Sequence, residues 1–217
     1  VTSPLVSKMA RVNGLDLVEV LTGFKWIRQA ALRYEEEVDG KFVFGMEESH
    51  GYLMGSHSGD KDGIWASMAF AEMAATLKKS NLTAIDRLNQ IHQQYGPHLD
   101  TLRTQTYTGT EGLEKIQQIM RKLRNSPPKS VAGQTVVKIT DYLENTIICA
   151  DATKNLQGPG LPKSNVISLE LSDNTRITAR PSGTEPKIKY YFNLHGKNSA
   201  LLQERLVEIQ AEFLSDQ

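Results

Sequence analysis

The stretch RPSGTEPKIKYYF, from Arg180 to Phe192, joins a stiff loop to a strand-like run. Pro181 and Pro186 restrict the backbone at the two ends of the loop. After Pro186 the residues alternate, so a strand would place two lysines on one face and the apolar side chains on the other. This alternation predicts a β-strand with Lys187 and Lys189 on one face and Ile188, Tyr190 and Phe192 on the other.

Three further runs before this loop have the same character: Gln134–Tyr142, Val166–Leu171 and Thr175–Ala179. A shorter run at Thr101–Thr106 precedes a helical segment. Strands and helices in this order favour an α+β module, an antiparallel sheet with helices on one face. Two amphipathic helices should cover that face, with apolar residues at Leu113, Ile116, Met120 and Leu123, and at Leu202, Leu206, Ile209 and Phe213.

The first part of the chain alternates helix and strand signals, which predicts an α/β unit with a partly parallel sheet. A β-type run at Leu15–Val20 precedes a helix at Lys25–Glu37, and KFVFG (Lys41–Gly45) is a second strand candidate. Ile64–Lys79 is rich in Ala and Met and predicts a buried helix. A last helix follows Thr83 with the stripe Ile85, Leu88, Ile91 and Tyr95. Gly96-Pro97 ends it, which predicts domains at 1–97 and 98–217.

The composition is that of an ordinary soluble globular protein, with 39% hydrophobic and 23% charged residues in 217. The 25 basic and 25 acidic side chains balance, which argues against a nucleic-acid partner. The sequence has no apolar run long enough for a bilayer and no secretory signal, so we expect no membrane partner and a cytoplasmic location. Cys149 is the only cysteine, which excludes an internal disulfide.

The loop after Arg180 has the chemistry of a phosphate site. Gly183 permits close backbone approach, and the N–H groups and hydroxyls of Ser182 and Thr184 can donate to an anion. Arg180 supplies a planar fork, and Lys189 and its neighbour Lys187 can lean toward the same anion. The competing interpretation is a plain turn with a solvated arginine. The cations on both sides of the loop favour phosphate binding.

The long polar loop from Gly45 to Gly63 contains GMEESHGY, in which Glu47 and Ser49 point to one side if the segment is extended. A carboxylate beside a hydroxyl suits the vicinal hydroxyls of a sugar. Spacing alone favours a solvated acidic loop instead. GDKDG (Gly59–Gly63) begins like a calcium loop but lacks the remaining ligands, so we expect no metal site in this sequence.

Together these loops resemble the α-D-phosphohexomutase family, the phosphoglucomutases and phosphomannomutases. TGFKWI (Thr22–Ile27) resembles a loop of the family's third domain, and Gly45–Tyr52 is similar to its sugar-specificity loop. Gly59–Ala66 resembles the Lys-Asp-Gly segment that follows, and Arg180–Lys189 is similar to the phosphate loop of the fourth domain. The resemblance implies an α/β third domain with a mixed sheet, followed by a fourth domain with a TATA-box-binding-protein-like fold.

The resemblance also implies a function. The chain would be the C-terminal half of a mutase that interconverts glucose 1-phosphate and glucose 6-phosphate through a phosphoserine and a sugar bisphosphate. Arg180, Ser182, Gly183, Thr184 and Lys189 would hold the phosphate that is not transferred. The sugar would meet Glu47 and Ser49, with Thr22, Gly23 and Lys61 as weaker candidates.

The family's phosphoserine loop and its Mg²⁺-binding Asp-Gly-Asp-x-Asp loop do not occur in this sequence. We therefore expect N-terminal domains of the same protein to supply the catalytic serine and Mg²⁺, and we expect the 217 residues alone to be inactive. Within the family, a mannose or pentose phosphate is the alternative substrate. A non-catalytic module that binds phospho-ligands is the alternative from another class.

Overall fold

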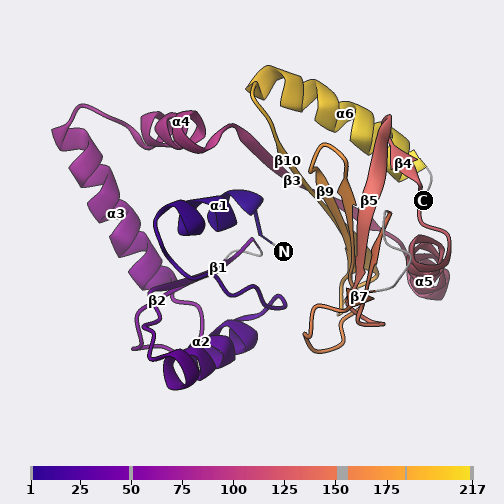
Figure 1. The fold of residues 1–217 in the computed structure, drawn as a ribbon, viewed down its shortest axis with the longest axis horizontal. Coiled ribbons are helices and arrows are strands. Elements are labelled where there is room, and N and C mark those ends of the chain that lie inside the picture. Colours follow the sequence, from indigo (N-terminus) through magenta and orange to yellow (C-terminus); the bar gives the residue numbers. More distant parts are fainter. Residues whose placement is uncertain (1, 49–50, 151–155, 184, 216–217) are drawn as a thin grey trace. The chain divides into compact units, whose positions relative to one another are not determined.

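The computed structural model describes residues 2–48, 51–150, 156–183 and 185–215. The chain divides into two compact units, residues 1–96 and residues 97–217, and each is described by itself (Figure 1). The division falls at the Gly96–Pro97 step. No helix in the described part of the chain combines the length and apolar character needed to cross a membrane.

The first unit is built from helices around a short hairpin, which confirms the predicted α/β class. Its elements are α1 (Pro4–Val12), α2 (Phe24–Val38), β1 (Phe44–Glu47), β2 (Gly51–Met54), α3 (Gly63–Lys79) and α4 (Ala84–Tyr95). The strands β1 and β2 are antiparallel, with Phe44 opposite Met54 and Glu47 opposite Gly51. Leu53 of β2 is fully buried.

One predicted strand and the predicted type of sheet were wrong for this unit, whereas the Lys41–Gly45 candidate overlaps β1. Leu15–Val20 forms no strand, because no described segment pairs with it, and Leu15, Leu17 and Val18 stay exposed. The partly parallel sheet is accordingly absent from the described residues, where β1 and β2 pair only with each other. The loop predicted from Gly45 to Gly63 is also shorter, since β1 ends and β2 lies within it.

Side-chain caps begin two helices of this unit, and the cap at Thr83 was predicted. The Asp62 side chain accepts from the Trp65 N–H at the start of α3, and Thr83 and Asp86 form a capping box at the start of α4. The burial predicted for the Ile64–Lys79 helix, α3, was wrong, however. No residue of α3 is buried, and in α4 only Tyr95 is.

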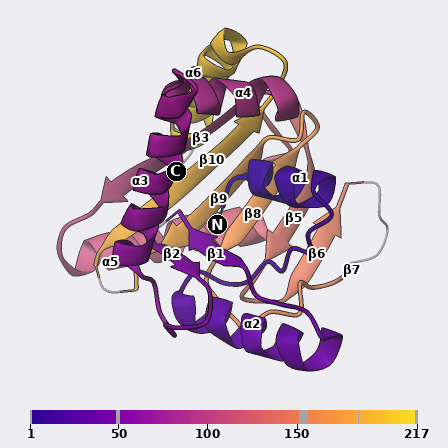
Figure 2. The ribbon, with the colours of Figure 1, turned by 90° about the vertical axis from the view of Figure 1, so that its left-hand side faces the viewer.

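The second unit is one antiparallel sheet with two helices, as the sequence predicts. Along the sheet the order is β3-β10-β9-β8-β5-β6-β7, and β4 pairs with β5; Figure 2 shows these strands side by side. The helices α5 and α6 lie on the same face of the sheet (Figure 1). The elements are β3 (His98–Thr106), α5 (Gly109–Asn125), β4 (Ser130–Val131), β5 (Gln134–Asp141), β6 (Thr146–Cys149), β7 (Leu156–Gln157), β8 (Ile167–Leu171), β9 (Arg176–Pro181), β10 (Lys187–His195) and α6 (Ser199–Ser215).

The core of this unit lies between the sheet and its two helices. Phe213 of α6 meets Tyr190 and Phe192 of β10 edge-on, at ring-centroid separations of 5.8 and 6.2 Å. From α5, Ile119, Met120 and Leu123 complete the layer, whereas Leu113, which was expected there, is 50% exposed. The period-two alternation of β10 therefore has the predicted effect, since Ile188, Tyr190 and Phe192 all face the helices.

Three strands were not predicted: β4, β6 and β7. Two of them are only two residues long, and β6 has four residues, TIIC, without polar alternation. Such short runs carry too little pattern to separate strand from loop. They form by pairing with neighbours that are already in place: β4 and β6 pair with β5, and β7 pairs with β6.

Candidate phosphate site

The two predicted cations of the phosphate loop lie directly opposite each other. Arg180 of β9 is the cross-strand partner of Lys189 of β10. Their neighbours Ala179, Ile188 and Tyr190 are buried in the core, so Arg180 and Lys189 lie on the face of the sheet away from the helices. The structure thus brings together two residues that are nine positions apart in the sequence.

Like charges directly opposite each other on a sheet destabilise it. Arg180 and Lys189 are both partly exposed, and neither makes an ion pair within the described residues. On its other side Lys189 faces Thr104 of β3, whose hydroxyl the sequence analysis did not include. An anion between the two cations would remove the repulsion and could also accept a hydrogen bond from Thr104.

The loop between the two strands is held at its base by backbone bonds. The Ser182 N–H donates to the Lys187 carbonyl at 2.8 Å, and the Tyr107 N–H donates to the Pro186 carbonyl at 2.9 Å. The Ser182 N–H is therefore not the free anion donor that was predicted. An added Cβ at Gly183 would meet nothing within 4 Å, so this glycine borders open space. Thr184 lies outside the described residues.

Lys187 does not join the other two cations as predicted. Its ammonium lies 2.9 Å from a carboxylate oxygen of Glu185, two residues earlier in the loop. Both side chains are partly exposed, so this pair adds little stability. The pairing leaves Arg180 and Lys189 as the two cations available to an anion.

The predicted sugar residues Glu47 and Gly23 contact each other in the first unit. A carboxylate oxygen of Glu47 accepts the Gly23 N–H at 2.6 Å. Gly23 is the N-cap of α2 with φ of 126°, a conformation open to glycine, and it has no side chain to cap the helix. Glu47 takes the place of the capping-box glutamate, although it comes from β1.

The other predicted sugar residues are less well placed. Thr22 directly precedes the α2 cap, and Ser49 lies outside the described residues. Lys61 is exposed and lies 3.4 Å from the Asp60 carboxylate. The sequence analysis named Glu47 and Gly23 separately as sugar candidates, and it could not find the helix-capping contact that joins them.

The acidic GDKDG segment (Gly59–Gly63) caps α3 through Asp62, and Asp60 accepts the Lys61 N–H in the turn before it. The Trp65 N–H, and then the His57 ring at 2.9 Å, hold the pKa of the Asp62 carboxyl below its usual value. Among the described residues, no group of three or more His, Cys, Asp or Glu side chains is placed to hold a metal ion.

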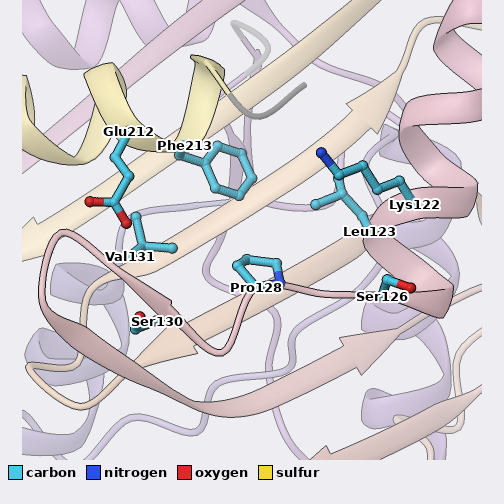
Figure 3. A pocket seen from close by; sticks show the side chains of 8 residues that line it. All are labelled: Lys122, Leu123, Ser126, Pro128, Ser130, Val131, Glu212 and Phe213. Atoms are coloured by element: carbon cyan, nitrogen blue, oxygen red, sulfur yellow. The ribbon is translucent and has the colours of Figure 1, made fainter.

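A small pocket of the second unit lies apart from the predicted site residues (Figure 3). It has a volume of about 60 Å³ and is formed where the ends of α5 and α6 meet β4. None of the predicted phosphate or sugar residues lines it. Its lining residues are Lys122, Leu123, Ser126, Pro128, Ser130, Val131, Glu212 and Phe213.

Comparison with known proteins agrees with the family resemblance stated from the sequence. Residues 1–95 match the family described as phosphoglucomutase/phosphomannomutase, alpha/beta/alpha domain III. The first unit of this chain thus matches the third-domain region of the phosphoglucomutase/phosphomannomutase family. The resemblance stated from the sequence is therefore confirmed, and so is the fold class, an α/β third-domain region followed by an antiparallel sheet with helices.

Relatives extend the match beyond the third domain. A phosphoglucomutase of Staphylococcus aureus (strain MSSA476) is 40% identical over 200 residues, and one of strain N315 is 39% identical over 196 residues. These alignments cover 91% and 89% of this chain. The chain spans about a third of the length of these relatives, 35% and 34% respectively.

A solved structure shows the same fold. It is the open form of pp63/parafusin, a phosphoglucomutase from Paramecium, which superposes with a TM-score of 0.62 at 23% identity. The superposition covers 97% of this chain and 36% of that one. Both units of this chain therefore have counterparts in that protein.

The Glu47–Gly23 contact predicts a stability effect in the first unit. Glu47→Ala should lower its free energy of unfolding by roughly 1.5–3 kcal/mol, because a charge-assisted hydrogen bond to a helix N-terminus is lost. Trp26 and Trp65, the only tryptophans, both lie in this unit, so fluorescence-detected urea unfolding reports on it. The control is Glu36→Ala, an exposed position of α2. Equal losses in both variants would contradict a capping role for Glu47.

Proposed function

We propose that this chain is the phosphosugar-holding part of a phosphoglucomutase that interconverts glucose 1-phosphate and glucose 6-phosphate. The reaction would run through a phosphoserine and a sugar bisphosphate intermediate. The phosphoserine would lie outside this sequence. A cytoplasmic location and a phosphosugar partner belong to the same proposal. Its support is the 40% identity to phosphoglucomutases over 200 residues.

One structural observation carries the binding role: Arg180 and Lys189 oppose each other across β9 and β10. Two cations in this arrangement fit a phosphate, whose oxygens can bridge them. Thr104 faces Lys189 across the strand pair, and Ser182, Gly183 and Thr184 follow Pro181 in the sequence. Together these residues would hold the phosphate that is not being transferred.

The first unit would supply the sugar contacts. One Glu47 oxygen accepts the Gly23 N–H. The other makes no hydrogen bond to a described residue, so it can accept one from a sugar hydroxyl. Ser49, Thr22 and Lys61 complete the proposed set. Mutases of this kind work by holding reactants in place and stabilising charge, and the proposed role of these residues is positioning.

The family's Mg²⁺ is not held by these residues. The described residues offer no suitable ligand group, and the sequence has no Asp-Gly-Asp-x-Asp loop. The proposal therefore assigns Mg²⁺ to other domains of the whole enzyme, where it would stabilise the charge of the transferring phosphoryl group.

The phosphate site can be tested on the 217-residue chain itself. Inorganic phosphate should bind without Mg²⁺ and should shift the amide signals of residues 180–189, while Glu47 stays nearly unchanged. Arg180→Ala should weaken this binding roughly 10- to 150-fold, which corresponds to a lost charge-assisted contact of about 1.5–3 kcal/mol. The measurement is an amide-shift titration of both proteins.

Arg121→Ala is the matched control, because Arg121 is exposed on α5 and bonds only to the Gln117 side chain in the same helix. Equal weakening in both variants would mean that phosphate responds to net charge alone. Shifts that begin at Glu47, or binding that needs Mg²⁺, would show that the phosphate loop has been assigned wrongly.

The mutase activity is tested in a chimera with a relative. This chain would replace the corresponding 200 residues of the S. aureus phosphoglucomutase, with which it shares 40% identity. The chimera should interconvert the two glucose phosphates. Turnover of mannose or pentose phosphates instead would correct the substrate, and a folded chimera without any mutase activity would favour a binding module.

A further inference from the structure

The start of β3 and the end of β10 meet in a pair of histidines. His98 is the cross-strand partner of His195, and the two rings are stacked with centroids 5.5 Å apart and planes inclined by 28°. Both residues are partly exposed. They lie near the start and near the end of the second unit's sequence, so only the pairing of β3 with β10 brings the imidazoles together.

The backbone pairing favours a close approach of these two side chains. Next to them, the Gly196 N–H donates to the Pro97 carbonyl at 3.1 Å. Opposed residues of an antiparallel ladder alternate between hydrogen-bonded and non-hydrogen-bonded pairs, so His98 and His195 form a non-hydrogen-bonded pair. In such a pair the Cα atoms are only about 4.5 Å apart, and the side chains lie closer together than in the hydrogen-bonded kind.

Both imidazoles lie on the face of the sheet away from α5 and α6. Leu194 belongs to the core under these helices, and successive side chains of a strand point to opposite faces, so His195 and its partner His98 lie on the other face. The next pair on that face is Asn193 and Asp100, in which the Asn193 amide donates to an Asp100 oxygen at 2.7 Å. The Asp100 carboxylate brings a negative charge near the imidazoles, which favours a bound cation.

Two imidazoles at this separation can share one transition-metal ion. An imidazole nitrogen binds Zn²⁺ at about 2.0–2.1 Å, which puts the centroids of two rings on one tetrahedral ion roughly 5 Å apart. The observed separation of 5.5 Å is close to this value. Imidazole suits Zn²⁺, Cu²⁺ and Ni²⁺, whereas Mg²⁺ takes oxygen ligands. No third His, Cys, Asp or Glu in the described ranges is placed to join the pair, so water would take the remaining positions.

We propose that His98 and His195 form a two-histidine chelate site for a divalent transition-metal ion of the zinc class. The ion would join β3 to β10 next to the Gly96–Pro97 boundary. Its binding stabilises the folded unit, because the unfolded chain does not hold the two histidines together. This inference goes beyond the proposed function and does not depend on it, and it concerns a different ion from the Mg²⁺ assigned to other domains.

A zinc titration of the 217-residue chain tests the site. Zn²⁺ should shift the ring signals of His98 and His195 before those of any other histidine, and Mg²⁺ should shift neither. His98→Gln and His195→Gln should each weaken zinc binding at least about 100-fold, because one of two linked ligands is lost. The matched controls are His57→Gln and His92→Gln, which should leave the affinity unchanged. His57 pairs with Asp62, and His92 is partly exposed on α4.

Amide hydrogen exchange separates chelation from loose surface binding, and it also works on the unchanged chain. Above the dissociation constant, each tenfold rise in Zn²⁺ should slow the slowest β3 and β10 amides about tenfold, because these amides exchange through opening of the whole unit. The slowing should vanish in both glutamine variants, whose exchange without metal checks that the unit is folded. Zinc that leaves exchange of the unchanged chain unaltered, or that shifts another histidine ring first, would overturn the proposal. So would an affinity that is the same without His98 or His195, or a complete lack of zinc binding.

Discussion

Phe213→Ala should lower the free energy of unfolding of the second unit by about 3–5 kcal/mol. Phe213 is only 2% exposed and meets Tyr190 and Phe192 of β10 edge-on. Removing its ring leaves a cavity between α6 and the strand that carries Lys189. Amide hydrogen exchange of β10 would measure the loss, because the slowest amides report on opening of the whole unit.

The control for this variant is Leu201→Ala on the same helix. Leu201 is 60% exposed, so the change should stay within about 0.5 kcal/mol. Phosphate affinity should also fall in Phe213→Ala if packing of α6 holds β10 in register opposite Arg180. A loss below about 1 kcal/mol would show that α6 is not a main support of the sheet.

Arg124→Ala should also destabilise the second unit by about 3–5 kcal/mol, because it leaves a buried carboxylate without its cation. Arg124 Nε lies 2.6 Å from an Asp141 oxygen, and these side chains are only 17% and 8% exposed. The same carboxylate accepts the Leu143 N–H at 2.9 Å, so it also holds the turn after β5. Hydrogen exchange of the β5 amides would measure the effect.

A half-exposed ion pair on the same strand is the comparison. Lys138 and Glu170 lie 2.8 Å apart with side chains 37% and 38% exposed. Lys138→Ala should therefore change stability by about 0–1 kcal/mol. Similar losses in Lys138→Ala and Arg124→Ala would mean that burial does not set the strength of these pairs.

The strands and helices of the second unit could be predicted from the sequence because their signals are local. Alternation in Lys187–Asn193 defines β10, and a 3.6-residue period defines α6. The family resemblance had the same basis, since each loop motif is a short stretch of chain. The Thr83 cap of α4 likewise lies within three residues of its partner Asp86.

Burial in the first unit could not be predicted in this way. The composition of α3 and the stripe of α4 indicate apolar faces, but a pattern cannot say what covers a face. Ile85 is 66% exposed and Leu88 is 44% exposed. Leu15–Val20 has the residues of a strand, yet a strand exists only when another strand supplies its hydrogen bonds.

The sequence by itself determined which residues are proposed to bind phosphate and sugar, because charge, hydroxyl groups and backbone freedom belong to individual residues. Only the tertiary structure decided which of them meet. The register of β9 and β10 places Arg180 opposite Lys189, and Lys187 instead pairs with Glu185. The packing of β1 against α2 brings Glu47 to Gly23, 24 residues away. Such contacts depend on pairing and packing between distant segments, and a local pattern carries no information on their register.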